Sequence, residues 1–271
     1  MELTFTILGC GPSGGVPLIG CECATCTSGD PKNKRTRASI LIEGGGTRVL
    51  VDTAPELRQQ ALREGFKTVD AILYTHAHAD HLHGIDDARS FNYHREGAIP
   101  VIATHEVAAE VNHRFNYAFH APVKGKGWLR PSLELQEIDD YSEFTVGNLH
   151  FFTYLQHHGK HHSTGYRIEN AAYSTDVDNI PEQSAQLLES LDLWIVDCLQ
   201  EEKAATHAHL EQTLGWIEQF KPKLAVLTHM AHQLEYEELK HRLPPGVVPA
   251  YDGMKIRLKN GHAEILATSP E

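Results

Sequence analysis

The segment DAILYTHAHADHLHG, residues 70–84, constrains this chain more than any other part of its sequence. An apolar run at residues 71–74 predicts a buried strand. Directly after it comes an H-x-H-x-D-H array, formed by His76, His78, Asp80 and His81. Three imidazoles and a carboxylate in six residues suit divalent ions that accept nitrogen and oxygen ligands together, such as zinc, manganese or iron. The chain is therefore expected to fold so that the end of one strand presents a metal-binding loop.

We expect this array to occupy a short, non-helical loop. Alternate side chains of such a loop can turn toward one point, so His76 and His78 would face one ion. Asp80 and His81 would then be offset toward a second ion. The chain has 19 histidines, and histidine is the side chain that most often binds metals. A histidine-rich surface loop is the alternative interpretation, but the fixed pattern directly after a strand favours a metal site.

Bulk composition limits the kinds of partner. The 271 residues include 41% hydrophobic and 22% charged side chains, which is typical of a globular protein. The excess of 36 acidic over 24 basic residues gives a net charge of -12. This argues against binding to an extended nucleic acid, which depends on lysine and arginine. A small phosphorylated substrate remains compatible, because bound divalent metals reverse the local field.

The sequence carries no targeting signal that we recognise. Its opening alternates like a strand and lacks a basic segment followed by a cleavage site. The apolar runs LWIV and LAVL are too short to span a bilayer. Three of the five cysteines lie within GCECATC, and an odd total suits a reducing compartment. We therefore expect a cytoplasmic protein with no membrane segment.

Strand and helix patterns alternate along the chain. Alternating or continuous apolar runs predict strands at residues 3–8, 38–44, 47–52, 70–75, 99–104, 149–155, 164–169, 171–176, 193–197, 223–229 and 254–258. Apolar residues three and four apart predict helices at residues 55–66, 105–115, 181–191, 209–220 and 232–243. No linker or repeat divides them. We predict an α/β fold in which two sheets pack face to face with helices outside, as one domain over residues 1–271.

The H-x-H-x-D-H array resembles the signature of the metallo-β-lactamase superfamily, which implies an αββα sandwich of two mixed β-sheets flanked by helices. In that family the remaining metal ligands follow later strands, and this chain offers a candidate after each of them. The resemblance implies an acid at Asp52 that is structural or contacts a metal ligand, and further ligands at His158, Asp176 and His229.

By the same resemblance, two divalent ions, Mn²⁺ or Zn²⁺, form a binuclear site. One would be held by His76, His78 and His158. The other would be held by Asp80, His81 and His229, and Asp176 would bridge the two. His157 is the alternative to His158, which we prefer because its step to Gly159 matches the family better.

Cysteines in the pattern C-x-C-x₂-C narrow the resemblance further. Cys21, Cys23 and Cys26 form a soft ligand set that favours zinc and needs a fourth ligand. The arrangement resembles the PhnP group of cyclic phosphodiesterases, which implies that His232 completes a structural Zn²⁺ site. The cysteine loop would then be an insertion at about residues 20–37. A redox or incidental cluster is the alternative, and the two isolated cysteines, Cys10 and Cys198, are expected to be buried apolar residues.

The PhnP resemblance also implies a chemistry. It predicts hydrolysis of a small cyclic phosphodiester, either 5-phosphoribosyl 1,2-cyclic phosphate in phosphonate metabolism or a 2′,3′-cyclic nucleotide, by a metal-bridging hydroxide. A histidine would protonate the leaving alkoxide, with His207 preferred over His209 and Asp197 orienting it. Asp80 is counted with these candidate catalytic residues as well as with the ligands. The family also implies a homodimer.

Other activities fit the same fold. A thioester or lactone hydrolase and a tRNA 3′-processing nuclease are alternatives, as is a non-catalytic metal or redox module. The acidic chain disfavours the nuclease, and the cysteine cluster with its candidate general acid disfavours the lactone hydrolase. The complete set of candidate ligands disfavours the non-catalytic module.

Three further features are expected to be structural. Asp252 within AYDGMK predicts an Asp-Gly hairpin turn. A basic stretch is interpreted as a solvated loop rather than a phosphate-binding patch: Lys32, Lys34, Arg35 and Arg37. Five histidines match no ligand motif and are expected on the surface or in the core: His83, His94, His105, His113 and His120.

Overall fold

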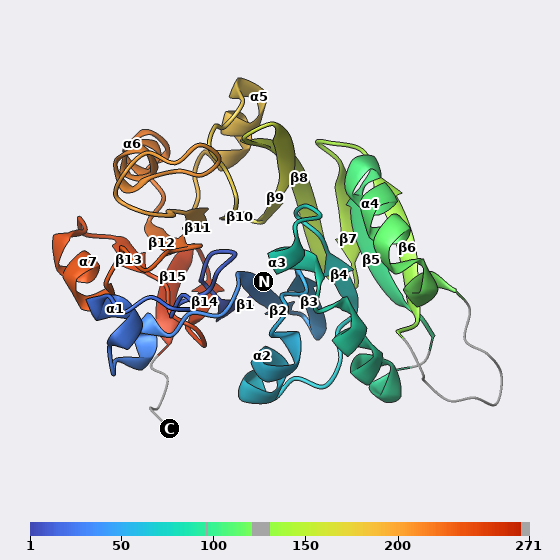
Figure 1. The fold of residues 1–271 in the computed structure, drawn as a ribbon. Helices are drawn as coiled ribbons and strands as arrows, with labels where there is room; N and C mark the ends of the chain where they lie inside the picture. The colour runs from blue at the N-terminus through green and yellow to red at the C-terminus, as the bar shows by residue number, and fades with distance from the viewer. Residues whose placement is uncertain (96, 121–130, 267–271) are drawn as a thin grey trace.

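Two mixed β-sheets form the centre of the molecule, with helices on the outside (Figure 1). The computed structural model describes residues 1–95, 97–120 and 131–266. The first sheet has eight strands in the order β15-β14-β1-β2-β3-β4-β5-β6. Their bounds are β1 (Leu3–Gly9), β2 (Ser39–Gly44), β3 (Thr47–Val51), β4 (Ala71–Leu73), β5 (Ile99–Thr104), β6 (Leu133–Ile138), β14 (Lys255–Lys259) and β15 (His262–Leu266). Strands β3 to β6 are mutually parallel, and the others pair antiparallel.

The second sheet has seven strands in the order β13-β12-β11-β10-β9-β8-β7. They are β7 (Glu143–Val146), β8 (Leu149–His158), β9 (His161–Ile168), β10 (Ala171–Ser174), β11 (Leu193–Asp197), β12 (Leu224–Thr228) and β13 (Val247–Pro249). Strands β10 to β13 are parallel, whereas β7 to β10 pair antiparallel. In both sheets the parallel strands end on the same edge, where the site described below lies.

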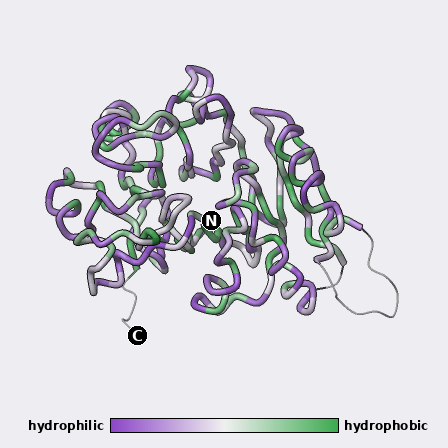
Figure 2. The backbone as a smooth tube through the Cα atoms, viewed as in Figure 1, coloured by the Kyte–Doolittle hydropathy of each residue, from purple (hydrophilic) through white to green (hydrophobic). Residues whose placement is uncertain are grey.

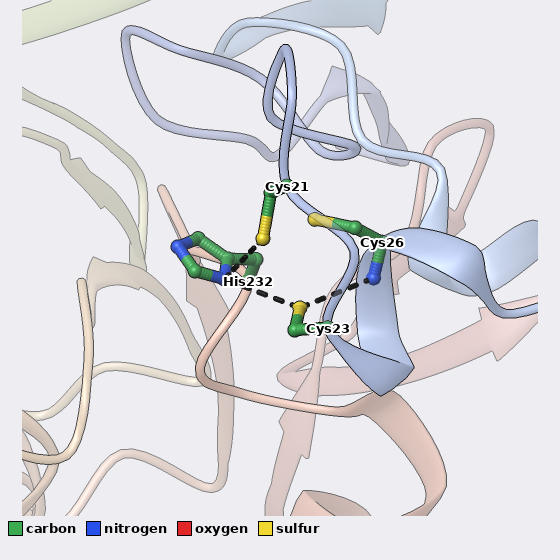
Figure 3. A group of neighbouring side chains, drawn as sticks. All are labelled: Cys21, Cys23, Cys26 and His232. Atoms are coloured by element: carbon green, nitrogen blue, oxygen red, sulfur yellow. Dashed lines mark hydrogen bonds between the residues drawn. The ribbon is translucent and has the colours of Figure 1, made fainter.

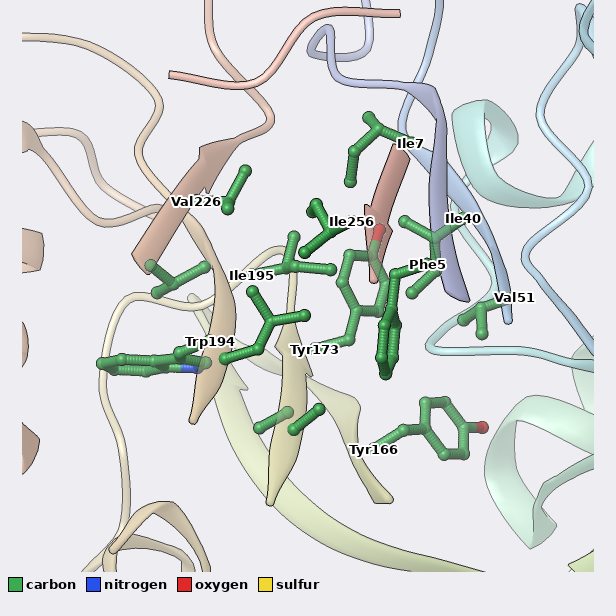
Figure 4. Close-up of a cluster of buried hydrophobic side chains, with 14 of the residues drawn as sticks. Phe5, Ile7, Ile40, Val51, Tyr166, Tyr173, Trp194, Ile195, Val226 and Ile256 are labelled. Atoms are coloured by element: carbon green, nitrogen blue, oxygen red, sulfur yellow. The ribbon is translucent and has the colours of Figure 1, made fainter. Parts of the chain in front are cut away.

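The main core fills the space between the two sheets. Side chains alternate across β3, so that Val49 and Val51 belong to this core while Leu50 belongs to a second cluster on the sheet's outer face. The inner faces meet in a layer of large side chains that includes Phe5 and Tyr173 (Figure 4). Hydrophobic segments accordingly follow the strands, and hydrophilic ones follow the outer helices (Figure 2).

Seven α-helices and four 3₁₀ segments connect the described strands. The α-helices are α1 (Ala24–Thr27), α2 (Leu57–Glu64), α3 (Ala79–Leu82), α4 (His105–Phe115), α5 (Glu182–Ala185), α6 (Leu210–Phe220) and α7 (Tyr236–Arg242). The 3₁₀ segments are η1 (Pro31–Asn33), η2 (Ile85–His94), η3 (Asn116–Phe119) and η4 (Gln186–Leu188). Helix α4 covers β5 and β6, and α7 lies beside β13 (Figure 1). Among the described residues, no helix is both long enough and apolar enough to cross a bilayer.

The predicted fold class is confirmed, and each predicted strand overlaps a strand of the structure. Two helix predictions need correction. The loop expected to be non-helical contains α3, which begins at Ala79 after the extended residue His78. The helix predicted at 181–191 is only the single turn α5 followed by η4. The edge strands β6, β7, β13 and β15 were not predicted, because they are short or mostly polar.

The Asp252 prediction was wrong in its topology. Residues 251–254 do form a turn, closed by a hydrogen bond from the Met254 N–H to the Tyr251 carbonyl. The strands on either side, β13 and β14, however, belong to different sheets, so the turn is not a hairpin. The Asp252 carboxylate instead accepts hydrogen bonds from the backbone of Cys10 and Thr36, which ties three segments together.

The basic stretch is only partly solvated. Lys32 pairs with Glu237, and Arg37 pairs with Glu56. Arg35, in contrast, is 1% exposed. Its Nη1 and Nη2 atoms donate to backbone carbonyls from far along the chain. The local sequence of a polar loop gives no sign of such distant partners.

Candidate metal centre

Strand ends bring the predicted ligands together. Asp52 follows β3, Asp176 follows β10 and His229 follows β12, each just past the last residue of its strand or two residues beyond it. These three residues have positive φ angles of 64°, 53° and 58°. Non-glycine residues rarely adopt this left-handed conformation, which persists where surrounding contacts impose it, typically at functional sites. Here it turns each side chain away from the strand direction and toward the common edge.

The side chains form two groups that share one carboxylate. Ligand atoms within 4.8 Å of one another define the first group as His76, His78, His158 and Asp176. The same criterion defines the second as Asp80, His81, Asp176 and His229. These are the two sets implied by the family resemblance. All are buried except His78.

Asp176 divides its two oxygens between the groups. Its Oδ1 lies 3.6 Å from His76 Nε2 and 3.8 Å from His158 Nε2. Its Oδ2 lies 3.1 Å from His81 Nε2 and 3.3 Å from His229 Nε2. A carboxylate placed in this way can serve two cations at once, as in two-metal hydrolytic sites.

Hydrogen bonds fix the far nitrogen of several of these rings. His81 Nδ1 donates to Asp52 Oδ2 at 2.7 Å, and His158 Nδ1 donates to the Thr206 carbonyl at 2.6 Å. Asp52 itself accepts from both the backbone and the hydroxyl of Thr75, each at 2.8 Å. Such outer contacts set the orientation of a metal-binding imidazole and present its other nitrogen.

Several ring nitrogens that face the shared carboxylate lack hydrogen-bond partners. Among the described residues, His76 Nε2, His81 Nε2 and both ring nitrogens of His229 are buried and make no hydrogen bond of acceptable geometry. A buried polar atom left this way is costly and calls for an explanation. Nitrogen and carboxylate donors in two groups of four fit divalent metal ions, which would satisfy one nitrogen of each of these rings.

The electrostatics of the cluster agree with cation binding. Burial alone would raise the pKa of Asp176, but the imidazoles of His229, His81 and His76 outweigh it and hold that pKa well below its usual range. Burial lowers the pKa of His76, so its ring favours the neutral form that binds metals. The carboxyl of Asp80 likewise has a lowered pKa: its burial is outweighed by His81 and His229.

His157 and His158 lie on different sides of β8. His158 is 3% exposed and its Nε2 lies 3.3 Å from His78 Nδ1. The His157 ring lies instead against His162, with ring centres 5.3 Å apart. Alternation along β8 places the two side chains on opposite faces of the strand, so only His158 reaches the first group.

A histidine–carboxylate pair adjoins the second group. His207 Nδ1 donates to Asp197 Oδ2 at 3.0 Å, and its ring stacks on His229 with centres 4.7 Å apart. Burial alone would lower the pKa of His207, but Asp197 outweighs it and raises that pKa to about 9. The alternative, His209, lies at the start of α6 and contacts Gln212, outside the residues that line the cleft.

Asp197 has further partners. Its Oδ2 also accepts from the backbone N–H of Val177 at 2.9 Å, the residue after Asp176. Its Oδ1 lies 3.9 Å from His229 Nδ1. The Asp197 carboxylate thus contacts both His207 and the backbone directly after Asp176.

The cysteine cluster is also assembled. Cys21, Cys23, Cys26 and His232 offer ligand atoms within 4.8 Å of one another (Figure 3). The distances from His232 Nδ1 are 3.7 Å to Cys21 Sγ and 3.3 Å to Cys23 Sγ. Hydrogen bonding from the Cys26 backbone, then from His232, lowers the pKa of Cys23 to about 6, which favours the thiolate. The cysteines form no disulfide, and this donor set fits tetrahedral zinc.

A cleft opens over the ligands. It has a volume of about 700 Å³ and is lined by residues from both groups together with Ser13, Lys160, Asp178 and His207. Sequence reasoning did not single out Lys160, which lies in the β8–β9 turn after Gly159. The one feature of the sequence that could have indicated Lys160 is its position two residues after the candidate ligand His158. Lys160 is the one lysine or arginine lining this cleft in the described part of the chain.

Comparisons with known proteins agree with this site. The sequence model of a family described as "Beta-lactamase superfamily domain" matches residues 47–230, more than half of the chain. A solved structure described as a new diphosphatase from the PhnP family is 36% identical, with a TM-score of 0.88, and the match covers 98% of this chain and 99% of that one.

Curated relatives match less of their own length. An octanoyltransferase of Porphyromonas gingivalis is 36% identical over 253 residues, which is 92% of this chain and 50% of that protein. A ribonuclease Z of Methanopyrus kandleri is 27% identical over 146 residues, which is 51% of this chain and 46% of that protein. The chain therefore spans about half the length of these two relatives.

Asp52 provides a test of the ligand geometry. Asp52→Asn should weaken divalent-metal binding by about 10–100-fold, because it removes the carboxylate that orients the His81 ring and increases its basicity. Competition with a chromophoric chelator measures the change. Asp192→Asn is the matched control, since Asp192 is also buried but pairs with Lys223. Equal losses in the two variants would contradict a specific role for Asp52.

Proposed function

Since the chain belongs to the metallo-β-lactamase superfamily, and within it to the PhnP family, we propose that it hydrolyses a phosphodiester bond in a small anionic substrate. Membership establishes a hydrolase fold with metal-binding clusters. The bond and the substrate are our inference. We propose a five-membered cyclic phosphodiester, such as 5-phosphoribosyl 1,2-cyclic phosphate or a 2′,3′-cyclic nucleotide.

The observation that carries the proposal is the shared carboxylate. Asp176 directs one oxygen to each ligand group, so the chain can hold two divalent ions side by side. Ions bound there would lower the pKa of a water molecule and neutralise charge on the phosphate oxygens. We assign one ion to His76, His78 and His158, and the other to Asp80, His81 and His229.

His207 is proposed to donate the proton that a departing alkoxide needs. It lines the cleft, and its Nδ1 is engaged by Asp197, which leaves Nε2 to face a substrate. Its raised pKa of about 9 keeps the ring protonated at neutral pH, and cations in the adjacent groups would bring that pKa back toward neutrality. Asp197 is proposed as its positioning residue.

The cleft favours a small anion. Its volume of about 700 Å³ lies in the range of small-molecule sites. Lys160 at its rim supplies a cation away from the metal ligands. We propose that this ammonium binds a second phosphate of the substrate, remote from the bond that breaks.

A diphosphate bond is the second candidate. It is favoured by the PhnP-family relative, which is a diphosphatase, and both bonds place a charged phosphoryl group at the metals. The octanoyltransferase and ribonuclease Z relatives make acyl thioesters and a precursor tRNA worthwhile comparison substrates.

Substrate profiling tests the proposal directly. Metal-defined protein should hydrolyse bis-p-nitrophenyl phosphate and cyclic phosphodiesters with a higher kcat/KM than it shows for diphosphate esters, thioesters, lactones or a precursor tRNA. Asp176→Ala should abolish turnover, which excludes a contaminating enzyme. Turnover of thioesters without turnover of any phosphodiester would overturn the proposal.

The general-acid assignment predicts a dependence on the leaving group. His207→Ala should lower kcat by about 10²–10⁴-fold for a cyclic phosphate with an alkoxide leaving group. The effect on bis-p-nitrophenyl phosphate should be small, because p-nitrophenolate leaves without a proton. In the wild type, kcat for the alkoxide substrate should fall as pH rises through the pKa of His207. His209→Ala is the control, and equal losses for both substrates would contradict the assignment.

Lys160 predicts a selective change in substrate binding. Lys160→Met should raise KM by about tenfold or more for a cyclic phosphate that carries a second phosphate, since a charge-assisted hydrogen bond is lost. The kcat for bis-p-nitrophenyl phosphate should not change. Lys203→Met, at an exposed lysine outside the cleft lining, is the control. An unchanged KM for the doubly phosphorylated substrate would rule out this contact.

A further inference from the structure

Arg35 is a buried cation that none of the proposed chemistry uses. Its side chain is 1% exposed. The Nη1 atom donates to the carbonyls of Met230 at 3.3 Å and Ala231 at 2.9 Å, and Nη2 donates to the Leu234 carbonyl at 2.5 Å. One guanidinium therefore fastens three carbonyls within five consecutive residues.

Both candidate metal centres draw a ligand from this short stretch. His229, immediately before the first fastened carbonyl, belongs to the group with Asp80, His81 and Asp176. His232, between the second and third, belongs to the cysteine cluster. A displacement of the 229–234 segment would therefore change both ligand sets together.

Arg35 itself belongs to the cysteine loop, so its side chain joins that loop to the 230–234 segment. The backbone of Arg35 pairs with Val16 through two hydrogen bonds of 2.7 and 2.9 Å, which closes the loop that carries the three cysteines. Asn33 adds a second attachment: its Oδ1 accepts from the Tyr236 N–H at 2.9 Å and from Arg35 Nη2 at 3.2 Å. The loop and the 229–236 segment are thus joined by two side chains in addition to the cluster itself.

His229 depends on such support. Its φ of 58° is a conformation that a non-glycine residue keeps only where its surroundings fix it. Neither of its ring nitrogens makes a hydrogen bond within the described structure, so hydrogen bonds of the next residue contribute that support. The Met230 N–H donates to the Cys10 carbonyl at 2.8 Å, and the Met230 carbonyl accepts from Arg35 Nη1 at 3.3 Å.

We propose that Arg35 is a positioning residue that couples the two metal centres, so that zinc in the cysteine cluster strengthens metal binding by the group containing His229. The inference rests on the metal assignments proposed above. A zinc ion held by Cys21, Cys23, Cys26 and His232 would fix the 229–234 segment against the loop. The planar guanidinium, with its rigid set of donors, transmits that constraint to His229. By linkage, metal at His229 strengthens zinc binding in the cysteine cluster by the same factor.

A double-mutant cycle on the full chain tests the coupling. The four proteins are the wild type, Cys23→Ser, Arg35→Met and the double variant. Zinc per chain is measured by atomic emission, and Mn²⁺ affinity of the binuclear group by electron paramagnetic resonance titration. In the wild-type background, Cys23→Ser should remove one zinc and weaken Mn²⁺ binding by about 5–150-fold. In the Arg35→Met background, the same change should weaken it by less than about twofold.

The possible results distinguish three hypotheses: the zinc site in the cysteine cluster, the coupling between the two centres, and the role of Arg35 in that coupling. If Cys23→Ser loses no zinc, the cysteine-cluster assignment fails and the coupling fails with it. If zinc is lost but Mn²⁺ affinity is unchanged, the cluster stands and the coupling is wrong. Equal losses in both backgrounds would show that the coupling bypasses Arg35. Turnover of bis-p-nitrophenyl phosphate tests the proposed function independently, and excess Mn²⁺ should restore it in Cys23→Ser.

Two further variants distinguish coupling from simple stability. Arg167 also donates to three backbone carbonyls, those of Glu169, Leu187 and Glu189, at the end of β9 away from the site. Arg167→Met should lower Tm while leaving the effect of Cys23→Ser on Mn²⁺ affinity intact. If Arg35→Met does not fold, Arg35→Lys replaces it. Lysine keeps the charge but not the fork of donors, so the coupling should still be lost; an intact coupling in that variant would refute the proposal.

Discussion

The carboxylate of Asp176 is the interaction on which the rest of this architecture depends. It is buried among four imidazoles from three different segments, and each of its oxygens faces a different ligand group. A buried anion in such a place is stable only if opposite charge surrounds it. Divalent cations held between the imidazoles would supply that charge. The two sheets, whose parallel strands end at one edge, provide the frame that brings those segments together.

Backbone strain concentrates at the same edge. Asp52, Asp176 and His229 all adopt left-handed conformations directly after their strands. Each conformation is unfavourable in isolation, and each turns a side chain toward the metal groups. The surrounding contacts that maintain them are specific, such as the Thr75 and His81 bonds to Asp52. Part of the stability of the two-sheet core is thus used to hold these ligands in place.

The sequence predicted the features whose signals are local. His76, His78, Asp80 and His81 are neighbours in the chain, so their proximity needed no knowledge of the fold. Assigning the later ligands required the family pattern, because strand ends converge only in three dimensions. Arg35 was missed for a related reason: a cation in a polar loop is normally solvated, and its burial depends on carbonyls 195 to 199 residues away. Helix α3 was missed because it has only four residues, and so short a segment shows no periodicity that distinguishes a helical turn from a loop.

Charge explains why the proposed phosphate substrate would depend on bound metal ions. The chain carries a net charge of -12, and Asp80, Asp176 and Asp178 line the cleft. Without bound cations, this field would repel a phosphate from the residues proposed to act on it. Two divalent ions would reverse the sign at the floor of the cleft, while Lys160 adds positive charge at its rim. The distance between the metal groups and Lys160 would then decide which anions bind well. A substrate with two phosphates, as proposed, would need one phosphate at the metals and the other at the lysine.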